Sequence, residues 1–203
     1  MPDRNDNGTG ALQVDIAEEP RVDLAAYSRV SIAFEVREIL SVEVRNAGLG
    51  GLALSEVNAE APYTKDYDLQ GDEAPAAWPT RFDISRWGFL IARANAEIVG
   101  AAAVAVDTPE LRLSEGRRDI ALLWDIRVSP EVRGRGVGTA LFAAAEAWAA
   151  HHRCSRLRVE TQNTNLPACR FYAGQGCELE AIRRFAYPQF PAEVQLLWTK
   201  VLA

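Results

Sequence analysis

The segment Val132-Arg-Gly-Arg-Gly-Val-Gly-Thr-Ala140 holds three glycines at every second position and two arginines, and an alanine-rich run follows it. Glycines allow a tight turn and let backbone N–H groups approach a ligand closely. The first turn of a helix presents unpaired N–H groups and the positive end of the helix dipole to an anion. Arg133 and Arg135 add charge that suits a diphosphate. The segment therefore predicts a diphosphate-binding turn that needs no metal; the alternative is a glycine-rich turn with solvated arginines.

Two familiar phosphate-binding sequences do not fit this segment. A P-loop requires a lysine directly after its last glycine, and no lysine lies here. The dinucleotide fingerprint requires a third glycine where Thr139 stands, and an acidic residue about 20 residues on, in the region where Arg158 lies. Both motifs therefore fit poorly, although the glycines, the arginines and the helix start still point to a phosphate group.

The elements around this segment follow from apolar runs and turn residues. Buried strands are expected at Asp119–Val128, which Ser129-Pro130 closes, and at Arg156–Thr161. A helix runs from the glycine segment to about His152, and a short helix covers Leu166–Gln175, with Pro167 in its first turn and Gly176 as its terminator. The remaining predicted strands are Leu12–Ile16, Ser31–Arg45, the hairpin Trp87–Arg93 with Glu97–Val106, Glu178–Ala186 and Val194–Leu202.

Two segments are harder to interpret. Phe34–Leu40, inside one predicted strand, has a pattern that could equally be helical. Ala59–Thr80 combines prolines, aromatic residues and acids without a period, so we expect a long surface loop there, a feature that is often functional. The order of strands and helices predicts a mixed α/β (α+β) domain over residues 12–203, with residues 1–11 as a disordered polar tail.

Composition narrows the function classes. The net charge of −6 argues against nucleic acid and mildly favours a cationic small molecule as partner. No apolar run is long enough for a membrane span, and the polar N-terminus lacks a signal core, so a cytoplasmic protein is expected. Three cysteines without a CxxC spacing and two adjacent histidines offer no evident metal site or disulfide framework.

The sequence resembles the GCN5-related N-acetyltransferase (GNAT) superfamily in two motifs. Arg133-x-x-Gly136-x-Gly138 is similar to the family's Q/R-x-x-G-x-G/A motif, and Asn165-x-x-Ala168-x-x-Phe171-Tyr172-x-x-x-Gly176-Cys177 is similar to its N-x-x-A-x-x-F/L-Y-x-x-x-G-F/C segment. The resemblance covers about Trp87–Leu202. It implies a GNAT fold, with a central mixed, mostly antiparallel β-sheet flanked by helices and a splayed pair of central strands. It also implies acetyl-CoA as cosubstrate, no metal, and a possible homodimer.

The resemblance also assigns roles to residues. Tyr172 would protonate the leaving thiolate and contact the cofactor. Many relatives use a glutamate of the central strand as base, but Trp124 stands at that position, so Asp125 and Glu160 are the candidates; salt bridges to Arg127 or Arg158 are the alternative for both. The remaining cofactor-binding positions would be Ile126, Arg127 and Val128 along the pantetheine arm, Arg133, Gly134, Arg135, Gly136, Val137, Gly138 and Thr139 at the diphosphate, and Asn165 and Ala168. Asn165 also suits a helix N-cap.

A narrower resemblance concerns the acceptor amine. Arg158–Cys169, Ala181–Tyr187 and Pro62–Tyr67 with the acids that follow resemble the corresponding parts of the streptothricin acetyltransferases. This implies acetylation of a β-lysine amine on a polycationic antibiotic, with substrate contacts from Tyr67, Asp68, Asp72 and Trp124; a solvated acidic loop is the alternative. Two other functions remain open: a protein lysine or N-terminal acetyltransferase, and a non-catalytic CoA-binding sensor.

Overall fold

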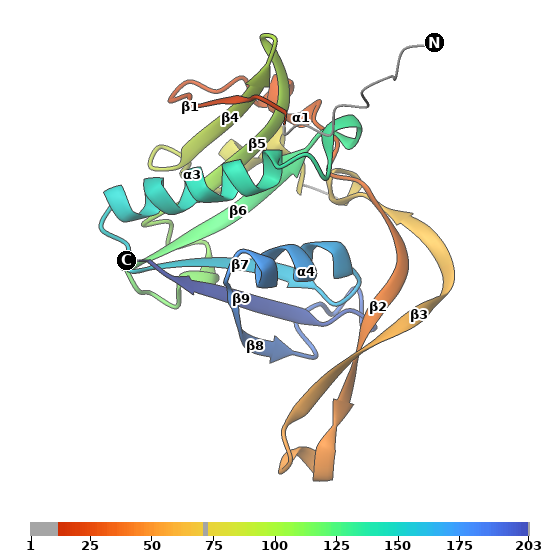
Figure 1. The fold of residues 1–203 in the computed structure, drawn as a ribbon. Coiled ribbons are helices and arrows are strands. Elements are labelled where there is room, and N and C mark those ends of the chain that lie inside the picture. The colour runs from red at the N-terminus through yellow and green to blue at the C-terminus, as the bar shows by residue number, and fades with distance from the viewer. Residues whose placement is uncertain (1–11, 71–72, 203) are drawn as a thin grey trace, which may run out of the picture.

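The central feature of the computed structural model, which describes residues 12–70 and 73–202, is a seven-stranded sheet in the order β1-β4-β5-β6-β7-β9-β8 (Figure 1). All its neighbouring strands are antiparallel except the parallel pair β6–β7. The strands are β1 (Asp15–Glu18), β4 (Gly88–Ala94), β5 (Glu97–Ala105), β6 (Ile120–Val128), β7 (Arg156–Gln162), β8 (Glu178–Arg183) and β9 (Gln195–Val201). The mostly antiparallel mixed sheet predicted from the sequence is confirmed.

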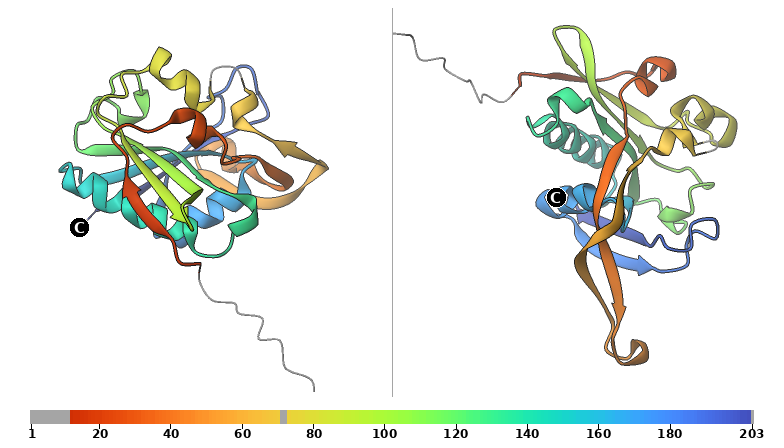
Figure 2. Two further views of the ribbon diagram at one scale, coloured as in Figure 1. Left: turned by 90° about the horizontal axis from the view of Figure 1, so that it is seen from above. Right: turned by 90° about the vertical axis from the view of Figure 1, so that its right-hand side faces the viewer.

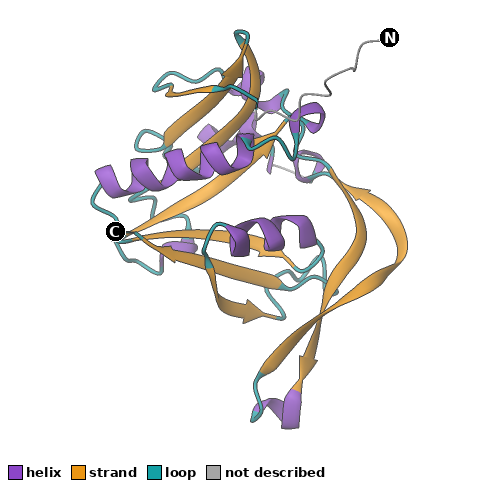
Figure 3. Cartoon of the chain, viewed as in Figure 1, coloured by secondary structure: helices purple, strands orange, loops and turns teal. Residues whose placement is uncertain are grey.

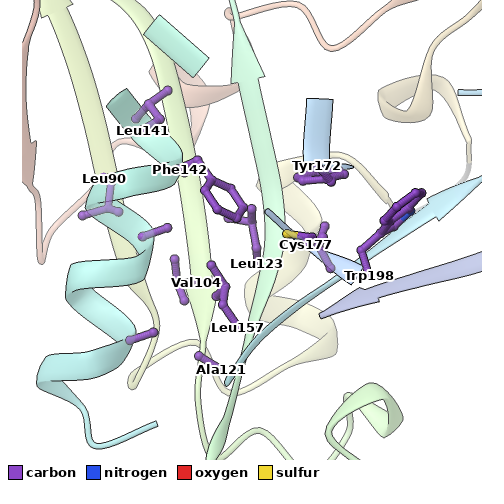
Figure 4. Close-up of a cluster of buried hydrophobic side chains, with 14 of the residues drawn as sticks. Leu90, Val104, Ala121, Leu123, Leu141, Phe142, Leu157, Tyr172, Cys177 and Trp198 are labelled. Carbon is purple, nitrogen blue, oxygen red and sulfur yellow. The ribbon is translucent and has the colours of Figure 1, made fainter. Parts of the chain in front are cut away.

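Helices cover both faces of the sheet. The longer ones, α3 (Val137–His151) and α4 (Leu166–Gly174), lie on one face, and their apolar residues join a core with β4 to β7 and β9. Figure 4 shows part of this core, with Phe142 and Leu141 of α3 above Leu123 and Val104. The other face is covered by α1 (Leu24–Ser28) and α2 (Trp78–Arg81), two short helices that the sequence did not predict, through a cluster that includes Tyr27 and Trp78.

The central strands β6 and β7 separate after half of their length. They pair only from Ile120 to Leu123 and from Arg156 to Val159, and then diverge (Figure 1). At the same place β6 contains a β-bulge, because Leu123 pairs with Val104 and Asp125 with Ala103, which leaves Trp124 as an extra residue. A bulge shifts the alternation of side chains, so Trp124 and Asp125 both face the α1–α2 side of the sheet. The expected splay is thus present.

The strands β2 (Phe34–Val44) and β3 (Leu52–Lys65) form a separate antiparallel hairpin that arches past α4 and extends beyond the sheet (Figures 1 and 2). Its middle is attached by two hydrogen bonds between Leu40 and Asn163, each 2.9 Å long. Figure 3 shows both segments as strands over their length, so the helical alternative for Phe34–Leu40 is wrong.

The expectation of a loop over Ala59–Thr80 is wrong for its first part, because β3 continues to Lys65. Pairing with β2, rather than an apolar period, maintains this strand, since most of its side chains are exposed on both faces. Residues 59–62, which include Pro62, bulge out where the ladder is interrupted opposite Arg37. The rest of the segment contains the 3-10 turns η2 (Tyr67–Leu69) and η4 (Pro75–Ala77), followed by α2.

The other predicted elements are confirmed, with shifted ends. The first strand begins at Asp15 rather than Leu12, the helix after the glycines ends at His151, and β8 ends at Arg183 rather than Ala186. The predicted tail of residues 1–11 and the predicted substrate contact Asp72 lie outside the described residues. Within the described part of the chain, no helix is both long and apolar enough to cross a membrane.

Candidate active site

A cavity of about 1400 Å³ opens where β6 and β7 diverge. Its wall combines the end of β6, the start of α3, one face of α4, the end of β3 with η2, and the segment between β8 and β9. The predicted site residues that line it are Tyr67, Asp68, Trp124, Asp125, Ile126, Arg127, Val128, Arg133, Gly134, Gly136, Gly138, Thr139, Glu160, Asn165, Ala168 and Tyr172. Tyr67 and Tyr172, which are 105 positions apart in the chain, therefore line the same space.

The glycine segment forms one end of this cavity. Gly134 and Gly136 have φ values of +75° and +88°, which only glycine adopts readily. Gly136 is the N-cap of α3 and provides no side-chain cap. No described residue accepts a hydrogen bond from the N–H groups of residues 137–139 at the start of this 15-residue helix. Unpaired donors at a helix N-terminus form an anion-binding site.

Three predicted diphosphate residues have side chains that serve other purposes or point elsewhere. Val137 is buried in the core, so only its backbone can reach a ligand. The Arg135 side chain is exposed, and Arg135 is not among the residues that line the cavity. Arg133 donates to the carbonyl groups of Val128, Ala33 and Ser31, each at 2.9 Å. Arg133 thus fastens the end of β6 to the segment before β2, and its contact with a diphosphate stays a prediction.

The outer half of β6 offers a free backbone edge. On one side residues 125–128 pair with β5, from Ala103 to Gly100, and on the other side no described strand pairs with them. Such an edge can take an extended ligand as an additional strand. The side chains of Ile126 and Val128 pack toward the α3–α4 core, whereas Asp125 and Arg127 point to the opposite face.

Asp125 and Arg127 form a buried ion-pair network. Arg127 donates to both Asp125 oxygens at 2.9 and 2.7 Å and to both Asp68 oxygens at 2.9 and 3.1 Å. The Tyr27 hydroxyl donates to Asp125 at 2.7 Å. Burial acts to lower the pKa of Arg127, but the two carboxylates raise it overall. The salt bridge considered as the alternative for Asp125 is therefore present, and both of its oxygens are occupied.

Glu160 is the first residue of β7 beyond the last pair with β6. Its Oε1 atom accepts hydrogen bonds from the Tyr187 hydroxyl and from Gln162 Nε2, the latter at 3.4 Å. Burial and the Glu160 charge raise the pKa of Tyr187 above its usual range, so this hydroxyl stays protonated. Arg158, the other considered partner, pairs with Glu180 at 2.6 Å instead.

Glu160 differs from the other carboxylates of the cavity wall. Asp68 and Asp125 pair with Arg127, Glu73 pairs with Arg81, and Glu193 pairs with Lys65. Among the described residues no lysine or arginine forms an ion pair with Glu160. Glu160 therefore differs from the other described carboxylates of the wall in having no charged partner.

Tyr172 lies on α4 with its ring packed against Phe142 and Phe171 and only 4% of its surface exposed. Figure 4 shows it at the edge of the core. Burial raises the pKa of Tyr172 well above its usual range, which keeps the hydroxyl protonated. It lines the cavity, and no described protein group forms a hydrogen bond with its hydroxyl. This proton is free for a ligand.

Asn165 caps α4, as its position before the helix suggested. Its Oδ1 accepts from the Ala168 N–H at 3.2 Å, and its Nδ2 donates to the Tyr67 hydroxyl at 3.4 Å. Trp124 packs against Phe82 and Trp87, with ring centres 5.2 and 5.9 Å away, and forms an aromatic part of the wall.

The polar residues of the site that sequence reasoning missed include Lys65, Gln162, Tyr187 and Glu193. Lys65 is buried and contacts both oxygens of Glu193 at 2.5 Å. The first three lie within or beside the segments that resemble streptothricin acetyltransferases, which was a usable signal. Glu193 had no signal, because its partner is 128 positions away. No cluster of three metal-ligating side chains occurs within residues 12–70 and 73–202.

Comparisons with known proteins identify the family of this chain. Residues 51–177 match the model of the acetyltransferase (GNAT) family. A streptothricin acetyltransferase of Escherichia coli is 32% identical over 80% of this chain and 82% of its own length. Streptothricin acetyltransferase A of Bacillus subtilis (strain 168) is 39% identical over 38% of this chain and 46% of its own.

Solved structures share the fold. A nourseothricin acetyltransferase has a TM-score of 0.72 at 22% identity, covering 94% of this chain and 99% of that one. A Bacillus anthracis str. Ames protein in complex with acetyl coenzyme A has the same TM-score at 21% identity, covering 96% and 100%. The chain belongs to the GNAT family of acetyltransferases and is an acetyl-CoA-dependent N-acetyltransferase, with streptothricin acetyltransferases among its relatives.

Proposed function

We propose that the chain transfers the acetyl group of acetyl-CoA to a primary amine of a small polycationic molecule of the streptothricin class, by direct attack in a ternary complex. The observation that carries the proposal is the single cavity that joins the unpaired N–H groups of α3, the free edge of β6, Tyr172 and Glu160. One space thus contains an anion site, a strand-like groove, a proton donor and a carboxylate.

The residues present fit acetyl-CoA. The N–H groups at the start of α3 and the left-handed glycines suit its diphosphate. The unpaired edge of β6 at residues 125–128 suits the amide groups of the pantetheine arm, and the Asn165 side chain lies across the splay from it. This placement brings the thioester toward Tyr172 and Glu160.

Two side chains then divide the proton transfers. The neutral amine nitrogen attacks the thioester carbonyl carbon, a C–N bond forms and the C–S bond breaks. Glu160 accepts the proton that the amine loses, and the Tyr172 hydroxyl protonates the departing thiolate. Asp125 takes no part in this scheme, because Arg127 and Tyr27 occupy its oxygens.

The amine side of the cavity suits a cation. Glu160 forms no ion pair with a described residue, and the rings of Trp124 and Tyr187 line the same space, whereas the rings of Tyr67 and Phe190 already face the Lys65 ammonium group. Aromatic faces attract ammonium groups. The names of the relatives support streptothricin as the acceptor. Asp68, in contrast, is paired with Arg127, so it offers the substrate no unpaired negative charge.

The test is acetyl-CoA-dependent thiol release with a panel of amines: streptothricin, aminoglycosides, polyamines, free lysine and short peptides. We expect turnover with streptothricin and a product that is heavier by one acetyl group. Turnover with peptides alone would replace the acceptor by a protein lysine or N-terminus. If no amine is turned over although CoA binds, the chain is a CoA-binding sensor and the proposal fails.

A further inference from the structure

The polar side chains between α4 and β7 form a continuous series of hydrogen bonds. Between the two ends of the series, each group accepts a hydrogen bond from the group before it and donates one to the group after it. The Ala168 N–H donates to Asn165 Oδ1 at 3.2 Å, so the Asn165 Nδ2 group faces the Tyr67 hydroxyl at 3.4 Å. The Tyr67 hydroxyl in turn donates to Gln162 Oε1. The backbone N–H group of Ala168 thus orients the Asn165 amide, and the Asn165 amide in turn orients the Tyr67 hydroxyl.

The second half of the chain ends at Glu160. Because Gln162 Oε1 accepts from Tyr67, its Nε2 group is the end that donates to the Tyr187 hydroxyl, at 2.9 Å. With its oxygen accepting from Gln162, Tyr187 donates its own proton to Glu160 Oε1. No described residue donates to Glu160 Oε2, so this oxygen is left for a ligand. In this arrangement each amide NH2 group donates to a hydroxyl oxygen, and each hydroxyl donates to an amide or carboxylate oxygen.

We propose that Tyr187 is a positioning residue that, oriented by Gln162, binds Glu160 Oε1 and so directs Oε2 to the acceptor amine. The inference rests on the proposed function, since it takes Glu160 as the base. A hydrogen bond from a hydroxyl to one carboxylate oxygen fixes the orientation of the whole group. The bond from Tyr187 to Oε1 therefore determines where Oε2 lies relative to the cavity.

Burial supports this role for both tyrosines. Burial raises the pKa of Tyr67 and of Tyr187 above their usual range, so both hydroxyls remain donors over the working pH range of a protein. Tyr187 lies between β8 and β9, in the same segment as Glu193, whose pair with buried Lys65 attaches that segment to the end of β3. The segment that carries Tyr187 is thereby attached to β3.

The test is a double-mutant cycle with Tyr187→Phe and Glu160→Gln, with streptothricin as acceptor or whichever panel amine is turned over. Tyr187→Phe should lower kcat about 10-fold, the effect of losing a hydrogen bond to a charged group, and leave the KM for acetyl-CoA unchanged. In the Glu160→Gln background the same substitution should change kcat less than about 2-fold, because its target is gone. The matched control is Tyr63→Phe, which removes a hydroxyl outside the cavity wall.

The outcomes separate the two proposals. If Glu160→Gln lowers kcat strongly but Tyr187→Phe has equal effects in both backgrounds, Tyr187 does not act through Glu160 and the inference is wrong. If Glu160→Gln alone leaves kcat unchanged, the proposed base fails, and the inference fails with it. Thermal unfolding and the Kd for CoA verify that each variant is folded; an unfolded Tyr187→Phe protein would overturn a purely positioning role.

Discussion

Asp68 and Arg127 form a bidentate ion pair between η2 and β6, with nitrogen–oxygen distances of 2.9 and 3.1 Å. The Arg127 side chain is 1% exposed and that of Asp68 19%. Arg127 also binds Asp125 and the Val30 carbonyl group. The pair therefore fastens the turn expected to contact the amine to the strand whose free edge suits the cofactor.

Arg127→Met should lower the free energy of unfolding by about 3–5 kcal/mol, because it leaves two carboxylates without their cation in a buried site. Asp68→Asn should cost less, since Arg127 keeps Asp125. The measurement is urea unfolding at neutral pH. Arg117→Met is the control: the Arg117–Asp119 pair is more than 40% exposed on both sides, so its loss should cost less than about 1 kcal/mol. Equal losses for Arg117 and Arg127 would contradict the network.

Tyr172→Phe should lower kcat about 100-fold or more while the Kd for CoA changes little, because only the proton for the leaving thiolate is removed. The ring remains, so packing against Phe142 and Phe171 is retained. Steady-state thiol release gives kcat, and calorimetry gives the Kd. Unchanged turnover would exclude Tyr172 as the proton donor.

Gly136→Ala should weaken CoA binding and lower stability by about 1 kcal/mol, because a residue with a Cβ is strained at the φ of +88° that places the start of α3. Gly174→Ala is a matched control: this glycine ends α4 without a positive φ, and an added Cβ would meet no atom within 4 Å. Calorimetric titration with CoA should separate the two variants. Similar Kd values would argue against a diphosphate at this turn.

The sequence predicted best what depends on neighbouring residues. The turn from β6 to α3 and the helix that carries Tyr172 follow from glycines, a proline and an N-cap asparagine within short segments. The β3 strand was missed because most of its side chains are exposed and it has no apolar period, so only its pairing with β2 defines it.

The side-chain partners could not be derived in the same way. Asp68 looked like a free acid of a loop, yet it is neutralised by Arg127, 59 positions away. In the sequence Asp125 and Glu160 were equal candidates for the base. Only the fold shows that Asp125 forms an ion pair with Arg127, whereas Glu160 accepts a hydrogen bond from Tyr187. Such pairs depend on which strands diverge and on where a β-bulge changes the face to which a side chain points. Neither property can be recognised from the residues of a short segment.

The three cysteines should be unreactive in the folded protein. All are buried, and burial raises the pKa of Cys154 and Cys169 and, against the opposing effect of Lys200, that of Cys177 to about 11. A thiol with a pKa near 11 is thiolate to only about one part in a thousand at pH 8, and the thiolate is the reactive form. A coloured disulfide reagent should therefore label the native protein at pH 8 far more slowly than the urea-unfolded chain.

The raised pKa of Cys177 in the folded protein also makes stability depend on pH. The contribution of Cys177 to stability is present below the ordinary thiol pKa of 9.0 and is lost as the pH rises through about 11. Rapid labelling of one native thiol at pH 8 would show that a cysteine is accessible to solvent.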